Sequence, residues 1–169
     1  MTMFAITMIA MENVHGAHKE LEKVLRLTRK KFGYSHKKVA AVLNNIGLCH
    51  FQLGGLRAAS KAFEEAVEIL RDVTNMRPQS SHIIENTLML GICLNNLAYI
   101  QCKRDEYAVA IVVLEEKLGL ERQLFGNDHD IVKETVRSLA NCMSIANCQD
   151  NKDKLEKMSK LYVAMLSST

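Results

Sequence analysis

The chain has 169 residues and a formal net charge of +3, and 48% of it is hydrophobic but only 5% aromatic. One proline and eight glycines interrupt a sequence rich in alanine, leucine, lysine, glutamate and methionine, which favours helix. The alternating apolar and polar runs that form strands are absent, so a predominantly β-sheet fold is excluded. Length and composition predict one all-α domain, large enough for a continuous apolar core.

The apolar opening of the chain predicts a helix at Thr2–Met11. It is shorter than the about 20 residues that span a bilayer, and it lacks the basic start and small-residue cleavage site of a signal peptide. We therefore expect no membrane span there. Helical periodicity and turn residues predict further helices at Glu12–Phe32, Lys37–Leu53, Leu56–Thr74, His82–Cys102, Glu106–Phe125, a helix opening at Asp128-His129, and Lys152–Leu166.

The sequence repeats itself. The run Phe32-Gly33-Tyr34-Ser35-His36 returns 93 residues later as Phe125-Gly126-Asn127-Asp128-His129. The same offset aligns Leu27 with Leu120, Arg29 with Arg122, Val39 with Val132, and Cys49 with Cys142. An intermediate copy lies at offsets of 51 and 42, so the period is 42 residues with nine more inserted around Pro78. One offset held over so many positions indicates internal duplication.

This period predicts a single domain over residues 1–169. It consists of a partial repeat (1–35), a repeat with the insertion (36–81), a third (82–128) and a C-terminal repeat with a capping helix (129–169). The partial repeat exposes an apolar face that a preceding repeat would cover. We therefore expect a fragment, a truncated gene model, or self-association through the N-terminal helix.

The repeat carries a recognisable pattern. Its first helix contains Leu43-Asn44-Asn45-Ile46-Gly47 or Leu94-Asn95-Asn96-Leu97-Ala98, and its second contains Ala59, Phe63 and Ala66 at Ala-x-x-x-Phe-x-x-Ala spacing. These pairs resemble tetratricopeptide repeats, and the longer period with its Phe-Gly-x-x-His connector resembles the kinesin-light-chain and nephrocystin-3-like subtype. The chain departs from that subtype in lacking proline after His36 and His129, in its insertion, and in Arg137-Ser138 replacing the third Asn-Asn.

The resemblance implies a right-handed α-solenoid of about three and a half repeats, whose first helices line a concave groove for a peptide of a partner protein. The asparagine pairs lie between core positions and point off the core, and a carboxamide both donates and accepts hydrogen bonds. An open alternative is that one asparagine of each pair bonds a neighbouring helix. We refer to the predicted contacts as the partner-binding set: Asn44, Asn45, Leu48, Phe51, Gln52, Asn95, Asn96, Tyr99, Lys103, Arg137 and Asn141.

No catalytic, metal or cofactor site is predicted. His36 and His129 begin helices in matching repeats, which indicates a capping or packing role rather than catalysis or metal binding. His15 and His18 have no third ligand nearby, and Gly54-Gly55 is a turn without the lysine and serine or threonine of a phosphate loop. We therefore expect a non-catalytic protein.

Charge and cysteines complete the prediction. The segment Lys19–Lys38 holds eight lysines or arginines against two acids, which would suit nucleic acid, acidic peptides or anionic lipid but is more typical of a solvated helix face. The five cysteines are an odd number without metal spacing, which favours a reducing, cytoplasmic location. The sequence thus predicts an adaptor or scaffold that binds a peptide, with nucleic acid unfavoured. The alternative is a structural subunit docking through its N-terminal helix and outer surface.

Overall fold

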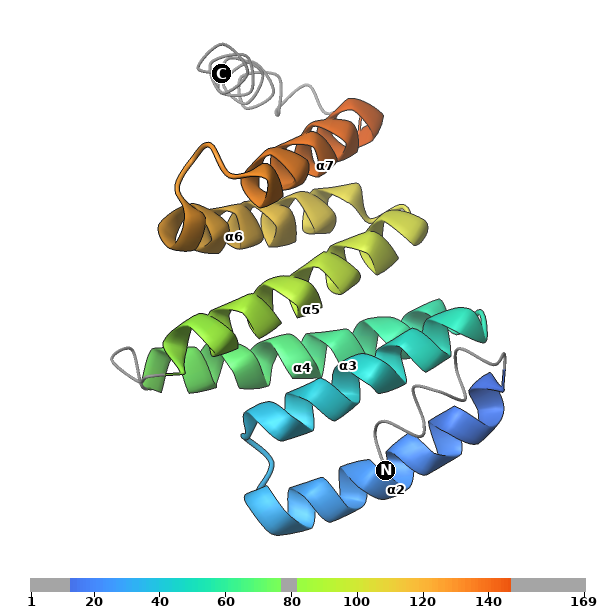
Figure 1. The fold of residues 1–169 in the computed structure, drawn as a ribbon. Helices are drawn as coiled ribbons and strands as arrows, with labels where there is room; N and C mark the ends of the chain where they lie inside the picture. Colours follow the sequence, from blue (N-terminus) through green and yellow to red (C-terminus); the bar gives the residue numbers. More distant parts are fainter. Residues whose placement is uncertain (1–12, 77–81, 147–169) are drawn as a thin grey trace. The chain divides into compact units, whose positions relative to one another are not determined.

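The computed structural model describes residues 13–76 and 82–146, and all regular structure in these two stretches is helical. The predicted helices Thr2–Met11 and Lys152–Leu166 and the insertion around Pro78 lie outside the described residues. The helices are α2 (Val14–Phe32), α3 (Lys37–Gln52), α4 (Leu56–Met76), α5 (Ile83–Lys103), α6 (Tyr107–Phe125) and α7 (Asp130–Ala146) (Figure 1). Each described end lies within two residues of its predicted position, so the all-α prediction is confirmed.

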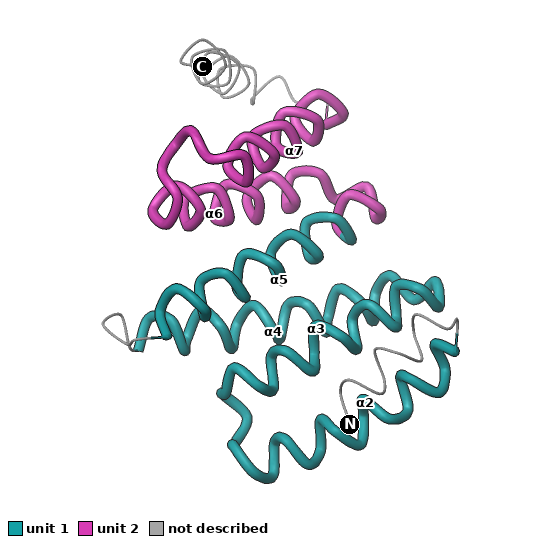
Figure 2. Tube along the Cα trace, viewed as in Figure 1, with its two compact units in different colours: residues 1–100 teal, residues 101–169 magenta. Residues whose placement is uncertain are grey.

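The chain divides into two compact units, residues 1–100 (unit 1) and 101–169 (unit 2) (Figure 2). The division falls inside α5, so the last three residues of that helix belong to unit 2. It does not coincide with a predicted repeat boundary.

In unit 1, α2 packs on α3 and α3 packs on α4. Between α2 and α3 lies an apolar cluster of Ala17, Leu21, Val24, Val42, Ile46 and Cys49, joined by Ala62 of α4. Gly47 permits the close approach of α3 to α4, because a Cβ added there would lie 2.5 Å from the ring of Phe63. The packing of α3 on α4 therefore requires a residue without a Cβ at this position.

In unit 2, α6 packs on α7, and the packing combines apolar and polar groups. Buried apolar side chains include Ile111, Leu114, Leu118, Val132, Val136, Leu139 and Met143. Among them lies a polar triad: the Lys117 ammonium pairs with the Glu121 carboxylate at 2.7 Å and donates to the Thr135 hydroxyl. Thr135 in turn donates to Glu121 at 2.6 Å, so three buried polar groups satisfy one another.

The Phe-Gly-x-x-His connectors have the same structure in both units. Gly33 and Gly126 adopt φ of +81° and +79°, a region that favours glycine, and their N–H groups donate to the carbonyls of Arg29 and Arg122. Imidazole Nδ1 then accepts a backbone N–H at the next helix start, 3.1 Å for His36 and 3.2 Å for His129. The predicted capping role of both histidines is confirmed.

Each capping histidine also stacks on the phenylalanine of its own connector. The Phe32 and His36 rings lie 4.7 Å apart at 22°, and the Phe125 and His129 rings lie 4.6 Å apart at 27°. The connector motif is therefore a joint between repeats, in which local hydrogen bonds and ring stacking fix the angle at which the chain turns.

In the described part of the chain, α5 is the one helix that is long and apolar enough, by length and composition, to cross a bilayer. Its most apolar 18 residues have a mean hydropathy of 1.3. Half of these residues are buried inside the protein, as in the core helix of a soluble domain. A single such helix is weak evidence for a span.

Candidate partner-binding face

In unit 1 the structure brings together predicted residues from α3 and α5. Asn96 Nδ2 donates to Asn44 Oδ1 at 2.9 Å, across 52 positions of sequence. Further along the same two helices, the Phe51 and Tyr99 rings meet edge to face, with centroids 5.5 Å apart and planes at 83°. Residues of the matching segments of two successive repeats therefore touch, and α3 and α5 present a shared polar and aromatic surface.

None of the predicted residues in unit 1 is buried. Tyr99 is 48% exposed, Gln52 and Asn95 are exposed, and Asn44, Asn45 and Asn96 are half-buried, as are Leu48 and Phe51. The prediction that the asparagine pairs point off the core is confirmed. The alternative, in which an asparagine bonds a neighbouring helix, is realised for Asn44 of α3 and Asn96 of α5, which bond each other.

That bond leaves hydrogen-bonding capacity on both carboxamides. A carboxamide carries two N–H donors and an oxygen with two lone pairs, and the Asn96–Asn44 bond uses one donor and one acceptor site. The pairing orients the remaining groups, because each amide plane is held by the other. It therefore prepares these side chains for a further polar contact at little entropic cost.

Three predicted residues belong to unit 2. Lys103, at the end of α5, and Asn141, on α7, are exposed. Arg137, one turn before Asn141, is exposed and pairs with Glu134 at 3.1 Å. The α7 contribution is therefore more charged than the α3 contribution.

An apolar stripe on α5 escaped the sequence prediction. Ile84, Leu88 and Ile92 are 58%, 40% and 58% exposed, and they follow one another at four-residue spacing. Asn95 and Tyr99 continue the same helical stripe. The sequence could have revealed this stripe. At an offset of 51 these positions correspond to Gly33, Lys37 and Ala41, none of which is a large apolar residue, so the apolar side chains are not required by the repeat itself.

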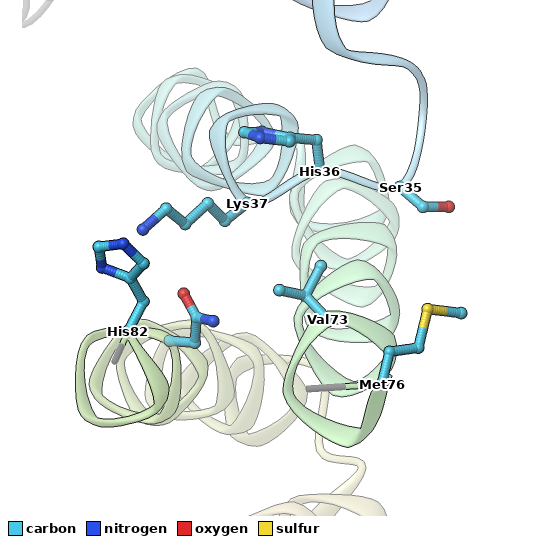
Figure 3. Close-up of a pocket in the computed structure, with 7 residues that line it drawn as sticks. Ser35, His36, Lys37, Val73, Met76 and His82 are labelled. Carbon is cyan, nitrogen blue, oxygen red and sulfur yellow. The ribbon is translucent and has the colours of Figure 1, made fainter. Parts of the chain in front are cut away.

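A cavity of about 360 Å³ lies elsewhere in unit 1, where α3 and α5 begin and α4 ends (Figure 3). It is lined by Ser35, His36, Lys37, Val73, Met76, His82 and Asn86. In Figure 3, Lys37 and His82 point toward one another, and both pair with the Glu85 carboxylate, Lys37 at 2.7 Å and His82 at 3.3 Å. The hydrogen bond from Lys37 lowers the pKa of Glu85. The cavity contains no residue of the partner-binding set.

A histidine pair joins α2 to α3. Nε2 of His18 and Nε2 of His50 lie 3.2 Å apart, so one ring donates and the other accepts. Burial, followed by the nearby His18, lowers the pKa of His50. His18 thus bonds a histidine 32 positions away, and sequence spacing alone did not indicate this contact. In residues 13–76 and 82–146 no three histidine, cysteine or acidic side chains gather as a metal site would require.

The basic segment Lys19–Lys38 is partly neutralised within unit 1. Lys23 pairs with Glu20 at 2.6 Å, Lys37 pairs with Glu85, and Arg29 pairs with Glu65 of α4. Lys38 lies 4.5 Å from the centre of the Phe32 ring. These contacts agree with a solvated, ion-paired helix face, which was the favoured interpretation of the sequence.

Comparison with known proteins identifies the repeat. Residues 2–72 match the family model described as tetratricopeptide repeat. The match covers both the partial repeat and the first complete helix pair, so the prediction of tetratricopeptide repeats is confirmed for this part of the chain. No curated protein matches this sequence.

Solved structures share the fold. BtubC (BKLC) from P. vanneervenii has a TM-score of 0.74 at 18% identity, over 97% of this chain and 62% of that one. The apo form of RapI has a TM-score of 0.58 at 15% identity, over 96% and 64%. A Podosopora anserina protein with nearly identical TPR-like repeats, assigned provisionally to the kinesin light chains, has a TM-score of only 0.43 at 13% identity, over 99% and 93%.

The first two similarities show that the fold is an all-helical repeat solenoid. This chain spans less than two thirds of the length of either protein. The low third score adds no structural conclusion, and the finer kinesin-light-chain-like assignment depends on the 42-residue period and the motifs of the sequence.

Proposed function

Since residues 2–72 match tetratricopeptide repeats and the fold is an all-helical repeat solenoid, we propose that the chain is a non-catalytic adaptor or scaffold that binds a peptide segment of a partner protein. The binding residues we propose are those of the partner-binding set, on α3 and α5 in unit 1 and, in unit 2, Lys103, Arg137 and Asn141. Repeat solenoids use their extended concave surfaces in this way. The free, largely buried thiols of Cys49, Cys93 and Cys142 support a reducing, cytoplasmic setting as part of the same proposal.

The contact between Asn96 and Asn44 is the observation that carries the proposal. One side chain from the asparagine pair of each of two repeats meets the other on a surface that is not buried, and the two are oriented without being saturated. The bond also joins neighbouring helices, and the proposal is that the donors and acceptors left over on the two amides bind the peptide. Carboxamides held in a row along successive helices suit the alternating donors and acceptors of an extended peptide backbone.

The α5 stripe defines the apolar part of the ligand. Ile84, Leu88 and Ile92 offer side chains that are about half exposed, and Tyr99 adds an aromatic ring at the end of the row. Burying such side chains stabilises a complex by roughly 25 cal/mol per Å² of apolar area. The ligand we propose therefore has apolar side chains that contact α5 and backbone amides that contact the asparagines.

The test compares bait proteins that differ on one surface only. Wild-type protein, the face variant Asn44→Ala/Asn96→Ala and the outer variant Glu68→Ala, whose substituted residue is exposed on α4, are used to capture partners that quantitative mass spectrometry identifies. A synthetic peptide from the captured partner is then titrated against all three proteins. We expect at least a tenfold weaker affinity for the face variant and unchanged affinity for the outer variant.

The reverse result would contradict the proposal. If the outer variant loses the partner and the face variant retains it, the surface assignment is wrong. Circular dichroism of each bait provides the control for folding, because the asparagine bond also contributes slightly to stability.

A second candidate function is a structural subunit that docks through its outer surface. On α6, Val109 and Val112 are 49% and 62% exposed at one-turn spacing, which is unusual for a solvated helix. Under this alternative, Val112→Asp or deletion of residues 1–11 would abolish capture, and the asparagine variant would have no effect.

A further inference from the structure

Two free cysteines of unit 2 lie in contact. Cys102 Sγ, in the last turn of α5, lies 3.1 Å from Cys142 Sγ of α7, although 40 positions separate them in sequence. Both residues belong to unit 2 (Figure 2), so the contact lies within one compact unit. The two thiols are closer than an ordinary van der Waals contact of two sulfur atoms.

From this geometry we propose that Cys102 and Cys142 form a reversible oxidative modification site, at which a small-molecule disulfide such as oxidised glutathione converts the dithiol into an intramolecular disulfide. A disulfide needs the sulfurs about 2.05 Å apart, so they must approach by about 1 Å. Cys102 is the penultimate residue of α5, and a helix end can make that movement more easily than a helix interior.

The two cysteines have different roles in the reaction. Cys102 is half-buried and is the one that solvent reaches, whereas Cys142 is 7% exposed. The Cys102 thiolate attacks one sulfur of oxidised glutathione, forming a mixed disulfide and releasing one glutathione thiolate. Cys142, after losing its proton, attacks the Cys102 sulfur and releases the second. The net change is two protein thiols and one glutathione disulfide giving one protein disulfide and two glutathione molecules.

The surroundings keep the Cys102 thiol protonated and make the rate of its oxidation depend on pH. Burial, with the hydrogen bond to Cys142 in support, raises the pKa of Cys102 to about 12. Since the thiolate is the attacking species, the rate of the first step rises about tenfold per pH unit below that value. The second step is fast once the first is complete, because the two sulfurs are already in contact.

The remaining buried cysteines provide a contrast. Burial raises the pKa of Cys93 to about 12 and also raises that of Cys49, and no sulfur contact is found for either in the described part of the chain. Among the four cysteines that the structure describes, only Cys102 and Cys142 combine a thiol within solvent reach with a second thiol ready to displace the oxidant.

The cross-link would also affect the proposed binding face. Cys102 precedes Lys103 and Cys142 follows Asn141, and both neighbours belong to the partner-binding set. This consequence rests on the proposed function: oxidation would fix the distance between Lys103 and Asn141, the two predicted partner contacts. The disulfide itself does not depend on that function.

The test is oxidation of the full chain in glutathione redox buffers between pH 7 and pH 9, followed by non-reducing peptide mapping. We expect a Cys102–Cys142 peptide that dithiothreitol removes, formed about tenfold faster per pH unit. Closure of the loop around α6 should raise the melting temperature of unit 2 by several degrees. This readout requires no partner, so its failure is distinct from failure of the proposed function.

Two variants sharpen the result. Cys142→Ser should stop the reaction at a stable glutathione adduct on Cys102, whereas Cys49→Ala, as a matched buried-thiol control, should leave the cross-link unchanged. The proposal is overturned if wild-type protein retains the glutathione adduct, remains fully reduced at pH 9, or links either cysteine to Cys148 instead.

Discussion

Two helix pairs of this chain, each linked by a Phe-Gly-x-x-His connector, have the same connector structure but differ in the residues packed between their helices. We call the packing of α2 on α3 the N-terminal joint and the packing of α6 on α7 the C-terminal joint; they are related by the 93-residue offset. In the N-terminal joint Val24 and Val42 belong to one apolar cluster. At the equivalent positions of the C-terminal joint stand Lys117 and Thr135, which form the buried triad with Glu121.

The difference is reversed at a second pair of positions. The N-terminal joint has the hydrogen-bonded His18 and His50, and the C-terminal joint has Ile111 and Met143, both buried, in their places. Each joint thus contains a polar group of contacts between its two helices, which is buried in the C-terminal joint and half-buried in the N-terminal joint. The comparison teaches that the capped glycine connector and the surrounding apolar positions set the helix geometry, whereas the polar contact can occupy either position.

The largest effect is expected from breaking the buried triad. Lys117 is only 8% exposed, and Glu121→Ala leaves its ammonium without its carboxylate. We expect the free energy of unfolding to fall by about 3–5 kcal/mol, measured by urea denaturation. The triple variant Lys117→Val/Glu121→Thr/Thr135→Val copies the N-terminal joint and should be at least as stable as wild type. A triple variant as unstable as Glu121→Ala would show that the two joints are not interchangeable.

A smaller loss is expected where two helices approach most closely. In Gly47→Ala the new methyl group would overlap the Phe63 ring, so we expect a loss of about 1–3 kcal/mol in thermal or urea unfolding. The matched control in unit 2 is Gly119→Ala on α6, where nothing lies within 4 Å of the added carbon. That change should stabilise by about 0.5–1 kcal/mol. Equal effects at both glycines would refute the packing argument.

Because the connectors have the same structure, we expect removal of either histidine cap to lower stability by the same amount. His36→Ala and His129→Ala each remove one side-chain acceptor at a helix start, and each should cost about 1 kcal/mol in denaturant unfolding. His36→Asn and His129→Asn should retain most of the stability, since asparagine caps helices well. A loss at one joint alone would mean that the connectors are not equivalent.

The smallest expected effect is a pH dependence confined to the N-terminal joint. Because the pKa of His50 is lowered from its ordinary 6.5, the folded chain binds fewer protons there than the unfolded chain. Stability should therefore fall as pH drops below 6.5 and level off below the pKa of the folded state. The variant His18→Ile/His50→Met, which copies the C-terminal joint, should lose this dependence in melting curves between pH 5 and pH 7.5. An unchanged slope would exclude the pair as its source.

Much of the fold could be predicted because its signals are local. The ends of α2, α3 and α6 follow from Gly33, Gly54 and Gly126, and the starts of α3 and α7 follow from the histidine caps. Each of these residues acts within a few positions of itself. The orientation of the asparagine pairs followed in the same way from helical periodicity. The apolar stripe Ile84, Leu88 and Ile92 was equally local and could have been found by comparing α5 with its counterparts at the 51-residue offset.

The sequence by itself therefore determined the repeat period, the helices between Val14 and Ala146, and the joints that connect them, since backbone hydrogen bonding and apolar spacing are written along the chain. Only the tertiary structure decided which polar side chains meet. The contacts Asn44–Asn96, His18–His50 and Cys102–Cys142 link positions 32 to 52 residues apart. A side chain can satisfy its hydrogen bonds with many partners, and packing alone selects one of them.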